Sequence, residues 1–314
     1  MDNRPIGVFD SGLGGLTVLR EIRKILPDEN IVYFGDCGRT PYGIKSPETI
    51  RRYTFQNTRF FMELGVKLLV IACNTSSAHA YRPVADALDF PVIEVIRPGS
   101  LAAVRATSNH KIGVIGTQAT VESRVYEDVI HGLDPSAEVF AKACPLFVPL
   151  VEEGPMWWGH EVARAIAGEY LGGMRETGMD CLVLGCTHYP LLEGVIREAA
   201  GGGIALISSA QAVASEVRGK LDETGMRRGG GAAGPAGPAG PSGVAGAAGV
   251  AGAAGGTPAN DVAGVVGPAA AGEVTLYTSD SPEKFEPLCG AILGEPANSR
   301  VRRLDIEKYE SRLF

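Results

Sequence analysis

ELGVKLLVIAC (residues 63–73) and ETGMDCLVLGC (residues 176–186) are two versions of one segment. The glutamate, the glycine, a Leu-Val pair and the final cysteine coincide without a gap, and Thr75 or Thr187 follows shortly after each cysteine. A second pair, IGVFDS (residues 6–11) and IGVIGT (residues 112–117), occurs in the same order. The simplest interpretation is that the chain contains two related units, one after the other.

Each repeated segment contains a short apolar run that is typical of a buried β-strand. Further runs at 31–34, 91–96 and 274–278 alternate with stretches of helical spacing, such as 78–88. Continuous apolar runs indicate strands covered on both faces of a mainly parallel sheet. We therefore predict an α/β fold with two pseudo-symmetric α/β domains and a ligand site in the cleft between them. The expected first domain is 1–97 plus 210–314, and the second is 98–209.

Residues 229–272 differ from the rest of the chain. They are almost entirely Gly, Ala, Pro and Val, and a glycine falls at every third position from 231 to 255. The spacing resembles collagen triplets, but the run is short and its prolines directly follow glycine. Such a composition buries too little apolar surface to order itself. We expect a disordered insertion in the first domain.

Bulk composition excludes several classes of protein. The 314 residues carry a net charge of −7, which argues against a general nucleic-acid or membrane-surface binder. The polar N-terminus is unlike a signal peptide, and no apolar run approaches the roughly 20 residues of a membrane span. We expect a cytoplasmic protein. None of the six cysteines sits in a CxxC pair or at zinc-ligand spacing with histidine, so we expect free thiols and no metal.

Cys73 and Cys186 each end a predicted buried strand. Ligands of open α/β sheets bind beyond the carboxyl ends of the strands, so the two thiols are expected to reach one ligand from opposite sides. A nearby helix N-terminus would favour the thiolate. Inversion of a stereocentre needs a base on one face and an acid on the other, and a pair of like thiols suits that task.

The alternative is that both cysteines are core residues of a duplicated sheet. The residues that follow them favour a ligand site instead. Asn-Thr-Ser at 74–76 and Thr-His-Tyr at 187–189 place hydrogen-bonding groups where each strand leaves the core.

Four segments resemble the signature sequences of the glutamate racemase family: GVFDSGLGG (7–15), YFGDCGRTPYG (33–43), VIACNT (70–75) and LGCTHYPLL (184–192). PLFVPLVEEG (145–154) and the Gly-Thr at 116–117 are also similar to that family. The resemblance covers nearly the whole chain except 229–272. It implies interconversion of L- and D-glutamate without a cofactor, which supplies D-glutamate for peptidoglycan in the bacterial cell wall, and it suggests a homodimer.

The resemblance also implies roles for individual residues. Cys73 would take the α-proton from D-glutamate and Cys186 from L-glutamate, with Asp10, Glu152 and His188 as catalytic helpers. Residues expected to hold the substrate are Asp10, Ser11, Tyr42, Gly43, Asn74, Thr75, Thr187 and His188. Ordinary structural roles stay open for three of these: a turn cap for Asp10, a surface carboxylate for Glu152 and a hydrogen-bonded core histidine for His188.

Two positions depart from the family pattern. Glu94 stands where the family has glycine, and Ser208 where it tends to have aspartate, so local packing there is in question. Alternative functions are an aspartate racemase or related two-cysteine racemase, and a non-catalytic regulatory protein on the same scaffold. A pyridoxal-phosphate racemase ranks last, because it needs a Schiff-base lysine and none adjoins the strand-end cysteines.

Overall fold

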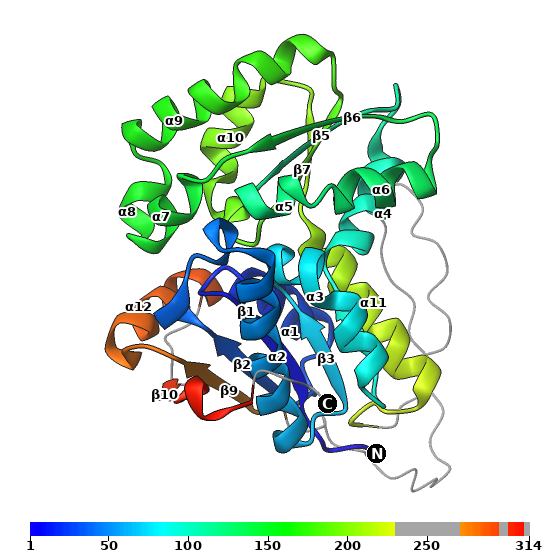
Figure 1. Cartoon of the computed structure of the whole chain (residues 1–314), viewed down its shortest axis with the longest axis vertical. Coiled ribbons are helices and arrows are strands. Elements are labelled where there is room, and N and C mark those ends of the chain that lie inside the picture. The colour runs from blue at the N-terminus through cyan, green and yellow to red at the C-terminus, as the bar shows by residue number, and fades with distance from the viewer. Residues whose placement is uncertain (230–270, 295–300, 311–314) are drawn as a thin grey trace, which may run out of the picture.

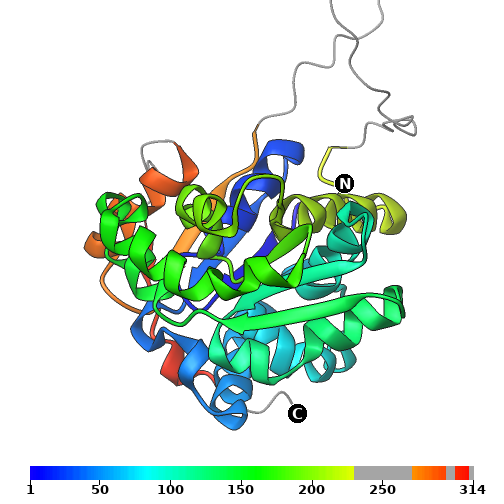
Figure 2. The same ribbon diagram turned by 90° about the horizontal axis from the view of Figure 1, so that it is seen from above.

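The computed structural model describes residues 1–229, 271–294 and 301–310. The insertion expected at 229–272 therefore lies outside the described residues except at its two ends. The described residues form two lobes, each built on a parallel sheet (Figure 1). Seen from above, helices lie on both sides of these strands (Figure 2). The predicted α/β fold with two parallel sheets is confirmed.

The first sheet has the strand order β10-β9-β2-β1-β3-β4. Its strands are β1 (Ile6–Asp10), β2 (Ile31–Gly35), β3 (Leu68–Ile71), β4 (Val92–Glu94), β9 (Val274–Thr278) and β10 (Val301–Arg303). The second sheet has the order β6-β5-β7-β8. Its strands are β5 (Lys111–Gly116), β6 (Glu138–Ala143), β7 (Cys181–Gly185) and β8 (Ala205–Ile207). The order β2-β1-β3-β4 thus matches β6-β5-β7-β8 strand for strand.

The sequence repeat has the same register in both sheets. Ile6 of β1 pairs with Leu68 of β3, and Ile112 of β5 pairs with Cys181 of β7, which are the residues that the repeat aligns. The repeated glycine before each strand has φ of 72° at Gly65 and 75° at Gly178. Left-handed backbone of this kind favours glycine, which explains why it recurs in both copies.

Helices cover both faces of each sheet. Those around the first sheet are α1 (Leu16–Ile25), α2 (Pro47–Leu64), α3 (Asn74–Ala87), α11 (Ser209–Thr224) and α12 (Pro282–Leu293). Those around the second are α4 (Ile96–Ala106), α5 (Gln118–Glu122), α6 (Val125–Leu133), α7 (Phe147–Glu152), α8 (Pro155–Trp158), α9 (Glu161–Leu171) and α10 (Glu193–Ala200). Short 3₁₀ turns occur at Cys37–Arg39, Tyr42–Ile44, Gly173–Thr177, Tyr189–Leu192 and Ile306–Lys308. The expected domain divisions fall in the first turns of α4 and α11.

Successive residues of the central strands enter different hydrophobic clusters. Leu68 and Val70 pack in the cluster that includes α1, α11 and α12, whereas Leu69 and Ile71 pack with α2 and α3. Because both faces are covered, no position of β3 faces water, and its apolar run is continuous.

Two predicted boundaries were wrong for local reasons. The helix expected at 78–88 begins already at Asn74, so only Ala72 and Cys73 separate the strand from the helix. The strand expected at 91–96 ends at Glu94, because the Glu94 carboxylate accepts the backbone N–H groups of Ile96 and Arg97 and starts α4. Burial raises the pKa of Glu94 to about 7. Ser208, the other departure, caps α11 by accepting the Ala210 N–H (3.4 Å).

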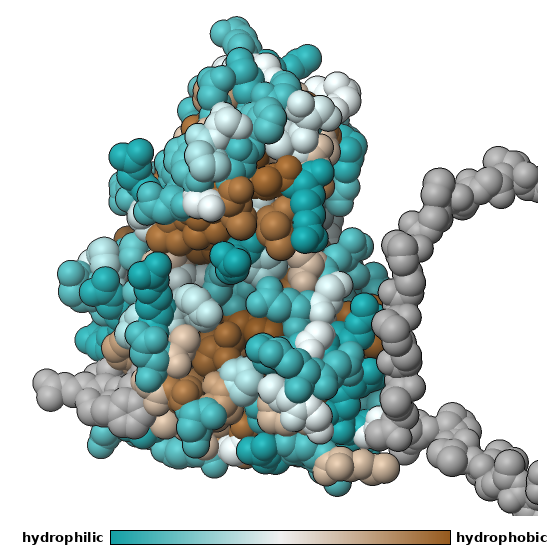
Figure 3. Space-filling view, turned by 90° about the vertical axis from the view of Figure 1, so that its right-hand side faces the viewer, coloured by the Kyte–Doolittle hydropathy of each residue, from teal (hydrophilic) through white to brown (hydrophobic). Residues whose placement is uncertain are grey.

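The face drawn in Figure 3 is mainly hydrophilic and is interrupted by hydrophobic patches. Within the described residues, no helix combines the length and the apolar character that crossing a membrane requires.

Candidate active site

Cys73 lies at the junction of β3 and α3, where it is the N-cap residue of the helix. Its Sγ accepts the backbone N–H of Ser76 at 3.5 Å, and the side chain is buried. Burial, and next the negative charge of Asp10, raise the pKa of the Cys73 thiol to about 12. The Ser76 N–H at the helix N-terminus lowers the pKa of Cys73, as expected, but the effect of burial is larger, so the net shift is upward.

Cys186 follows β7 directly and has an imidazole beside it. Its Sγ lies 3.7 Å from Nδ1 of His188, and Nε2 of His188 lies 2.6 Å from Oε1 of Glu152, the last residue of α7. Burial alone lowers the pKa of His188, but the contacts with Cys186 and Glu152 outweigh it and raise that pKa well above its ordinary value. The doubly protonated ring suits these two neighbours, since each of its N–H groups faces an acceptor.

Asp10 ends β1 and is fully buried. Its Oδ2 accepts the backbone N–H groups of Gly12 (3.2 Å) and Gly15 (3.1 Å), and its Oδ1 accepts the Thr187 hydroxyl (3.3 Å). The carboxylate therefore holds the glycine-rich turn in place and connects it to the loop after Cys186. Its position beside the Cys73 thiol adds a negative charge there.

A small cavity lies between the two cysteines. Residues of both lobes line it: Ser11, Pro41, Tyr42, Gly43, Cys73, Asn74, Thr75, Thr117, Val148, Cys186, Thr187 and His188. Its open volume is about 10 Å³, which is room for about one water molecule. The sequence-predicted residues are thus brought together, with Asp10 and Glu152 hydrogen-bonded to lining residues from behind.

The two lobes approach each other closely around this cavity. A β-carbon on Gly43 would lie 2.3 Å from Cβ of Thr117, and one on Gly14 would lie 2.5 Å from Nδ1 of His188. Only glycine leaves room for these approaches. The glycines of the turn after β1 therefore let the second lobe pack closely against this turn, which explains why the segment is rich in glycine.

Tyr42 lines the cavity, but its hydroxyl bonds to residues of the first lobe. That hydroxyl bonds to Asp36 and accepts from Nδ2 of Asn57 at 3.1 Å, both in the first lobe. Any contact of Tyr42 with a ligand would thus come from its backbone.

Sequence reasoning did not include Thr117 or Val148 among the site residues. Thr117 lines the cavity, and its hydroxyl lies 3.0 Å from that of Thr75 and 2.9 Å from that of Thr120. A signal for it was present, because the repeat of residues 6–11 at 112–117 aligns Thr117 with Ser11.

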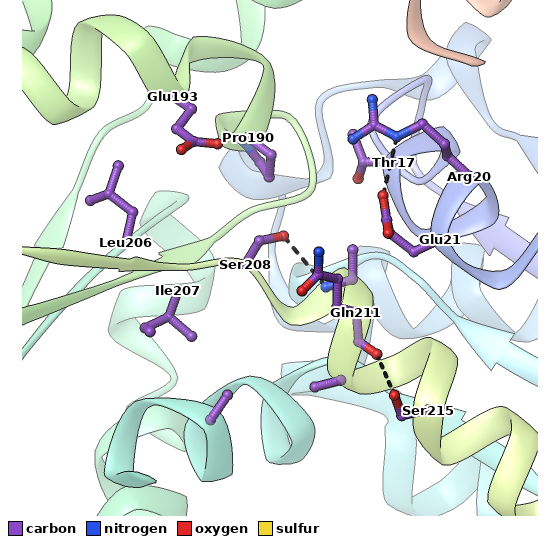
Figure 4. A pocket seen from close by; sticks show the side chains of 13 residues that line it. Thr17, Arg20, Glu21, Pro190, Glu193, Leu206, Ile207, Ser208, Gln211 and Ser215 are labelled. Carbon is purple, nitrogen blue, oxygen red and sulfur yellow. Dashed lines mark hydrogen bonds and ion pairs between the residues drawn. The ribbon is translucent and has the colours of Figure 1, made fainter. Parts of the chain in front are cut away.

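Larger hollows occur away from the cysteines. One of about 510 Å³ lies between α1, α11 and the chain after β7. Figure 4 shows that Arg20 and Glu21 are paired on its wall, while Ser208 and Ser215 bond within α11 and its cap. It contains neither Cys73 nor Cys186. Among the described residues, no group of three or more His, Cys, Asp or Glu side chains is arranged to hold a metal ion.

Comparison with known proteins agrees with this geometry. The family model described as Asp/Glu/Hydantoin racemase matches residues 6–217. A glutamate racemase of Geobacter metallireducens is 51% identical over 211 residues, which are 67% of this chain and 77% of that protein. A glutamate racemase of Listeria monocytogenes is 47% identical over 217 residues, 69% of this chain and 81% of that one.

Solved structures give the same result. The glutamate racemase of Francisella tularensis, determined in complex with D-glutamate, superposes with a TM-score of 0.79 at 31% identity and covers 98% of this chain and 100% of its own. Sequence repeat, paired cysteines, matched fold and family model lead to one conclusion: the chain belongs to the Asp/Glu/hydantoin racemase family.

Proposed function

We propose that this protein is a glutamate racemase that interconverts L- and D-glutamate by proton transfer between two cysteines, without a cofactor. The observation that carries the proposal is that Cys73 and Cys186, from different lobes, line one small cavity. A thiol on each side of a substrate can remove the α-proton from one face and return a proton to the other.

In the proposed reaction, Cys186 takes the α-proton of L-glutamate and Cys73 protonates the opposite face to give D-glutamate. The roles are exchanged for D-glutamate. The raised pKa of Cys73 makes it a thiol in the free protein at neutral pH, which is the form that donates to a carbanion. Conversion of L-glutamate thus starts from the resting protonation of Cys73, whereas conversion of D-glutamate first needs its thiolate.

His188 and Glu152 act as a proton-holding pair for Cys186. An imidazolium at 3.7 Å from Sγ can stabilise the thiolate that forms there, and Glu152 stabilises the imidazolium. Asp10 keeps the turn at 12–15 in place and discourages negative charge on Cys73 until substrate is bound.

The remaining lining residues suit an amino acid with two carboxylates. Hydroxyls of Ser11 and Thr75 and the backbone N–H groups at the start of α3 are donors for carboxylate oxygens. The open volume of about 10 Å³ is far below the size of glutamate, so substrate entry requires the lobes to separate. Closure around the substrate would then exclude water from the reacting carbon.

The relatives suggest the cellular context. We assign the product D-glutamate to peptidoglycan synthesis and the reaction to the cytoplasm, where a reducing environment keeps the catalytic thiols free. We also propose a homodimer, which light scattering on the purified protein tests.

Polarimetry tests the activity. Purified protein is incubated with L-glutamate or with L-aspartate, without added cofactor, and optical rotation is followed to equilibrium. We expect rotation to decay to zero with glutamate and to persist with aspartate. Decay with aspartate alone would identify an aspartate racemase, and no decay with either would favour a non-catalytic role.

A further inference from the structure

Tyr126, a residue of the second lobe, does not line the cavity itself but forms a hydrogen bond with Asn74, which does. It lies in the first turn of α6, in the second lobe, and is 2% exposed. Nδ2 of Asn74, at the start of α3 in the first lobe, donates to the Tyr126 hydroxyl at 2.7 Å. This hydrogen bond therefore joins the two lobes beside Cys73.

In the Asn74 carboxamide, Nδ2 forms a hydrogen bond but Oδ1 does not. The side chain is buried and lines the cavity, yet its Oδ1 makes no hydrogen bond in the protein. A buried acceptor without a partner is costly, so such a group calls for a donor supplied by a ligand. Of the polar groups on glutamate, the α-ammonium is the donor.

The Tyr126 ring has little freedom to move. It packs so closely on the backbone before Cys186 that a β-carbon on Gly185 would lie 3.1 Å from its Cε2. Burial, and next the charge of Glu94, raise the pKa of its hydroxyl well above the ordinary value, so it stays a neutral phenol. The hydroxyl is thus a fixed hydrogen-bond partner for Asn74.

We propose that Tyr126 is a positioning residue: by holding Nδ2 of Asn74 from the second lobe, it turns Oδ1 toward the substrate's α-ammonium. This inference rests on the proposed function. It goes beyond that function because it makes recognition of the ammonium depend on a contact that exists only when the lobes are together. A loosened lobe would leave Asn74 free to turn.

A comparison of two ligands tests the inference. Glutarate has both carboxylates of glutamate but no ammonium. In Tyr126→Phe, we expect KM for L- and D-glutamate to rise about 10-fold, the equivalent of one hydrogen bond to a buried group, with a smaller change in kcat. The inhibition constant of glutarate should stay within about 2-fold of wild type, because the carboxylate contacts are intact.

A double-mutant cycle with Asn74→Ala tests whether Tyr126 acts through Asn74. We expect Tyr126→Phe to have almost no further effect on KM when Asn74 is already alanine. Tyr170→Phe is the control, because the Tyr170 hydroxyl also accepts one N–H, here the backbone N–H of Leu146 (3.2 Å), but Tyr170 lies outside the cavity. Tyr170→Phe should leave both the KM for glutamate and the inhibition constant of glutarate unchanged. Thermal unfolding of each variant confirms that the fold is retained.

Three results would overturn the inference: additive effects in the cycle, equal weakening of glutamate and glutarate, or a Tyr126→Phe protein with wild-type KM. In each of these the wild type still racemises glutamate, so the proposed function stands. A wild type that does not racemise glutamate would overturn the proposed function and this inference with it.

Discussion

The two cysteines occupy matching positions of a repeated fold but lie in different surroundings. Cys73 caps a helix, is buried beside the Asp10 carboxylate and has a pKa of about 12. Cys186 precedes a 3₁₀ turn and lies against His188, which Glu152 holds. The repeat aligns His188 with Thr75, whose hydroxyl forms hydrogen bonds with those of Thr117 and Thr120. The duplicated strands thus place the two thiols alike, while their neighbours differ: a carboxylate lies beside Cys73, and an imidazole held by a carboxylate lies beside Cys186.

The largest expected effect comes from removing either thiol. Cys73→Ala and Cys186→Ala should each lower the racemisation rate by about 10³-fold or more, because the proposed reaction uses one thiol on each face of the substrate. Polarimetry with both enantiomers measures this. If one variant kept near wild-type activity, a single base would serve both faces of the substrate, and the proposed division of roles between Cys73 and Cys186 would be wrong.

The next largest effect concerns His188 and Glu152, which lie beside Cys186 and have no counterpart beside Cys73 among the described residues. His188→Asn should lower kcat/KM by about 10²-fold. Because the enantiomers have equal free energy, kcat/KM must fall equally in both directions, and the asymmetry appears in kcat and KM separately. Thr75→Ala, at the aligned position, should cost less. An equal loss in the two variants would contradict the special role of the imidazole.

Glu152→Gln sharpens this comparison through pH. The contact with Glu152 helps to raise the pKa of His188, so the ring keeps its proton to higher pH than an ordinary imidazole. Removing the negative charge should lower that pKa. The high-pH limb of the kcat profile should therefore move to lower pH, while a profile that stays in place would show that His188 does not titrate in the rate.

On the other side, Asp10→Asn should make Cys73 easier to ionise. Burial is the main cause of the raised pKa and the charge of Asp10 is the second, so its removal lowers the pKa in part. We expect alkylation of Cys73 by iodoacetamide at pH 8.5 to accelerate several-fold, about what a pKa drop below one unit gives. Peptide mass spectrometry resolves it from Cys186. Slower alkylation of Cys73 would contradict the assignment.

Glu94 supplies a control outside both cysteine sites. Its pKa of about 7 lies above the ordinary 4.5, so the stability that its protonated form contributes is present below pH 4.5 and is lost as pH rises to 7. Glu216, Arg97, Tyr81 and Tyr126 are the charged or titratable neighbours. From pH 4 to pH 8, Glu94→Gln should gain about 3 kcal/mol of unfolding free energy relative to wild type.

Urea unfolding at several pH values measures this difference. Activity at pH 7 should change little in Glu94→Gln. A large loss of activity would mean that the junction between β4 and α4 affects the cysteines.

Much of the fold was predictable because it depends on local apolar runs and an internal repeat. Residues 68–71 and 181–184 are buried on both faces, so their apolar runs are continuous and indicate buried strands. The edge strand β6 was not predicted, because it is only partly buried and carries Glu138 and Lys142 within it. The end of the strand expected at 91–96 was misplaced because the Glu94 side chain accepts the N–H groups of Ile96 and Arg97 and so starts α4.

The candidate site divides in the same way. Position at a strand end identified both cysteines. The pKa of Cys73 could not be predicted, because it depends on burial and on Asp10, which is remote in sequence. Tyr126 gave no signal, since an aromatic residue in the first turn of a helix is an ordinary core residue until its hydroxyl is seen on Asn74.

The most direct test of the two-base account is the position of the isotope in the first product. Wild-type protein is mixed with L-glutamate in D₂O, without cofactor, and both enantiomers are isolated at less than about a tenth of conversion. If Cys186 removes the α-proton and Cys73 delivers a solvent-exchanged one, D-glutamate will carry deuterium at Cα while the remaining L-glutamate stays unlabelled. Equal labelling of the two enantiomers from the start, or D-glutamate without deuterium, would contradict the account.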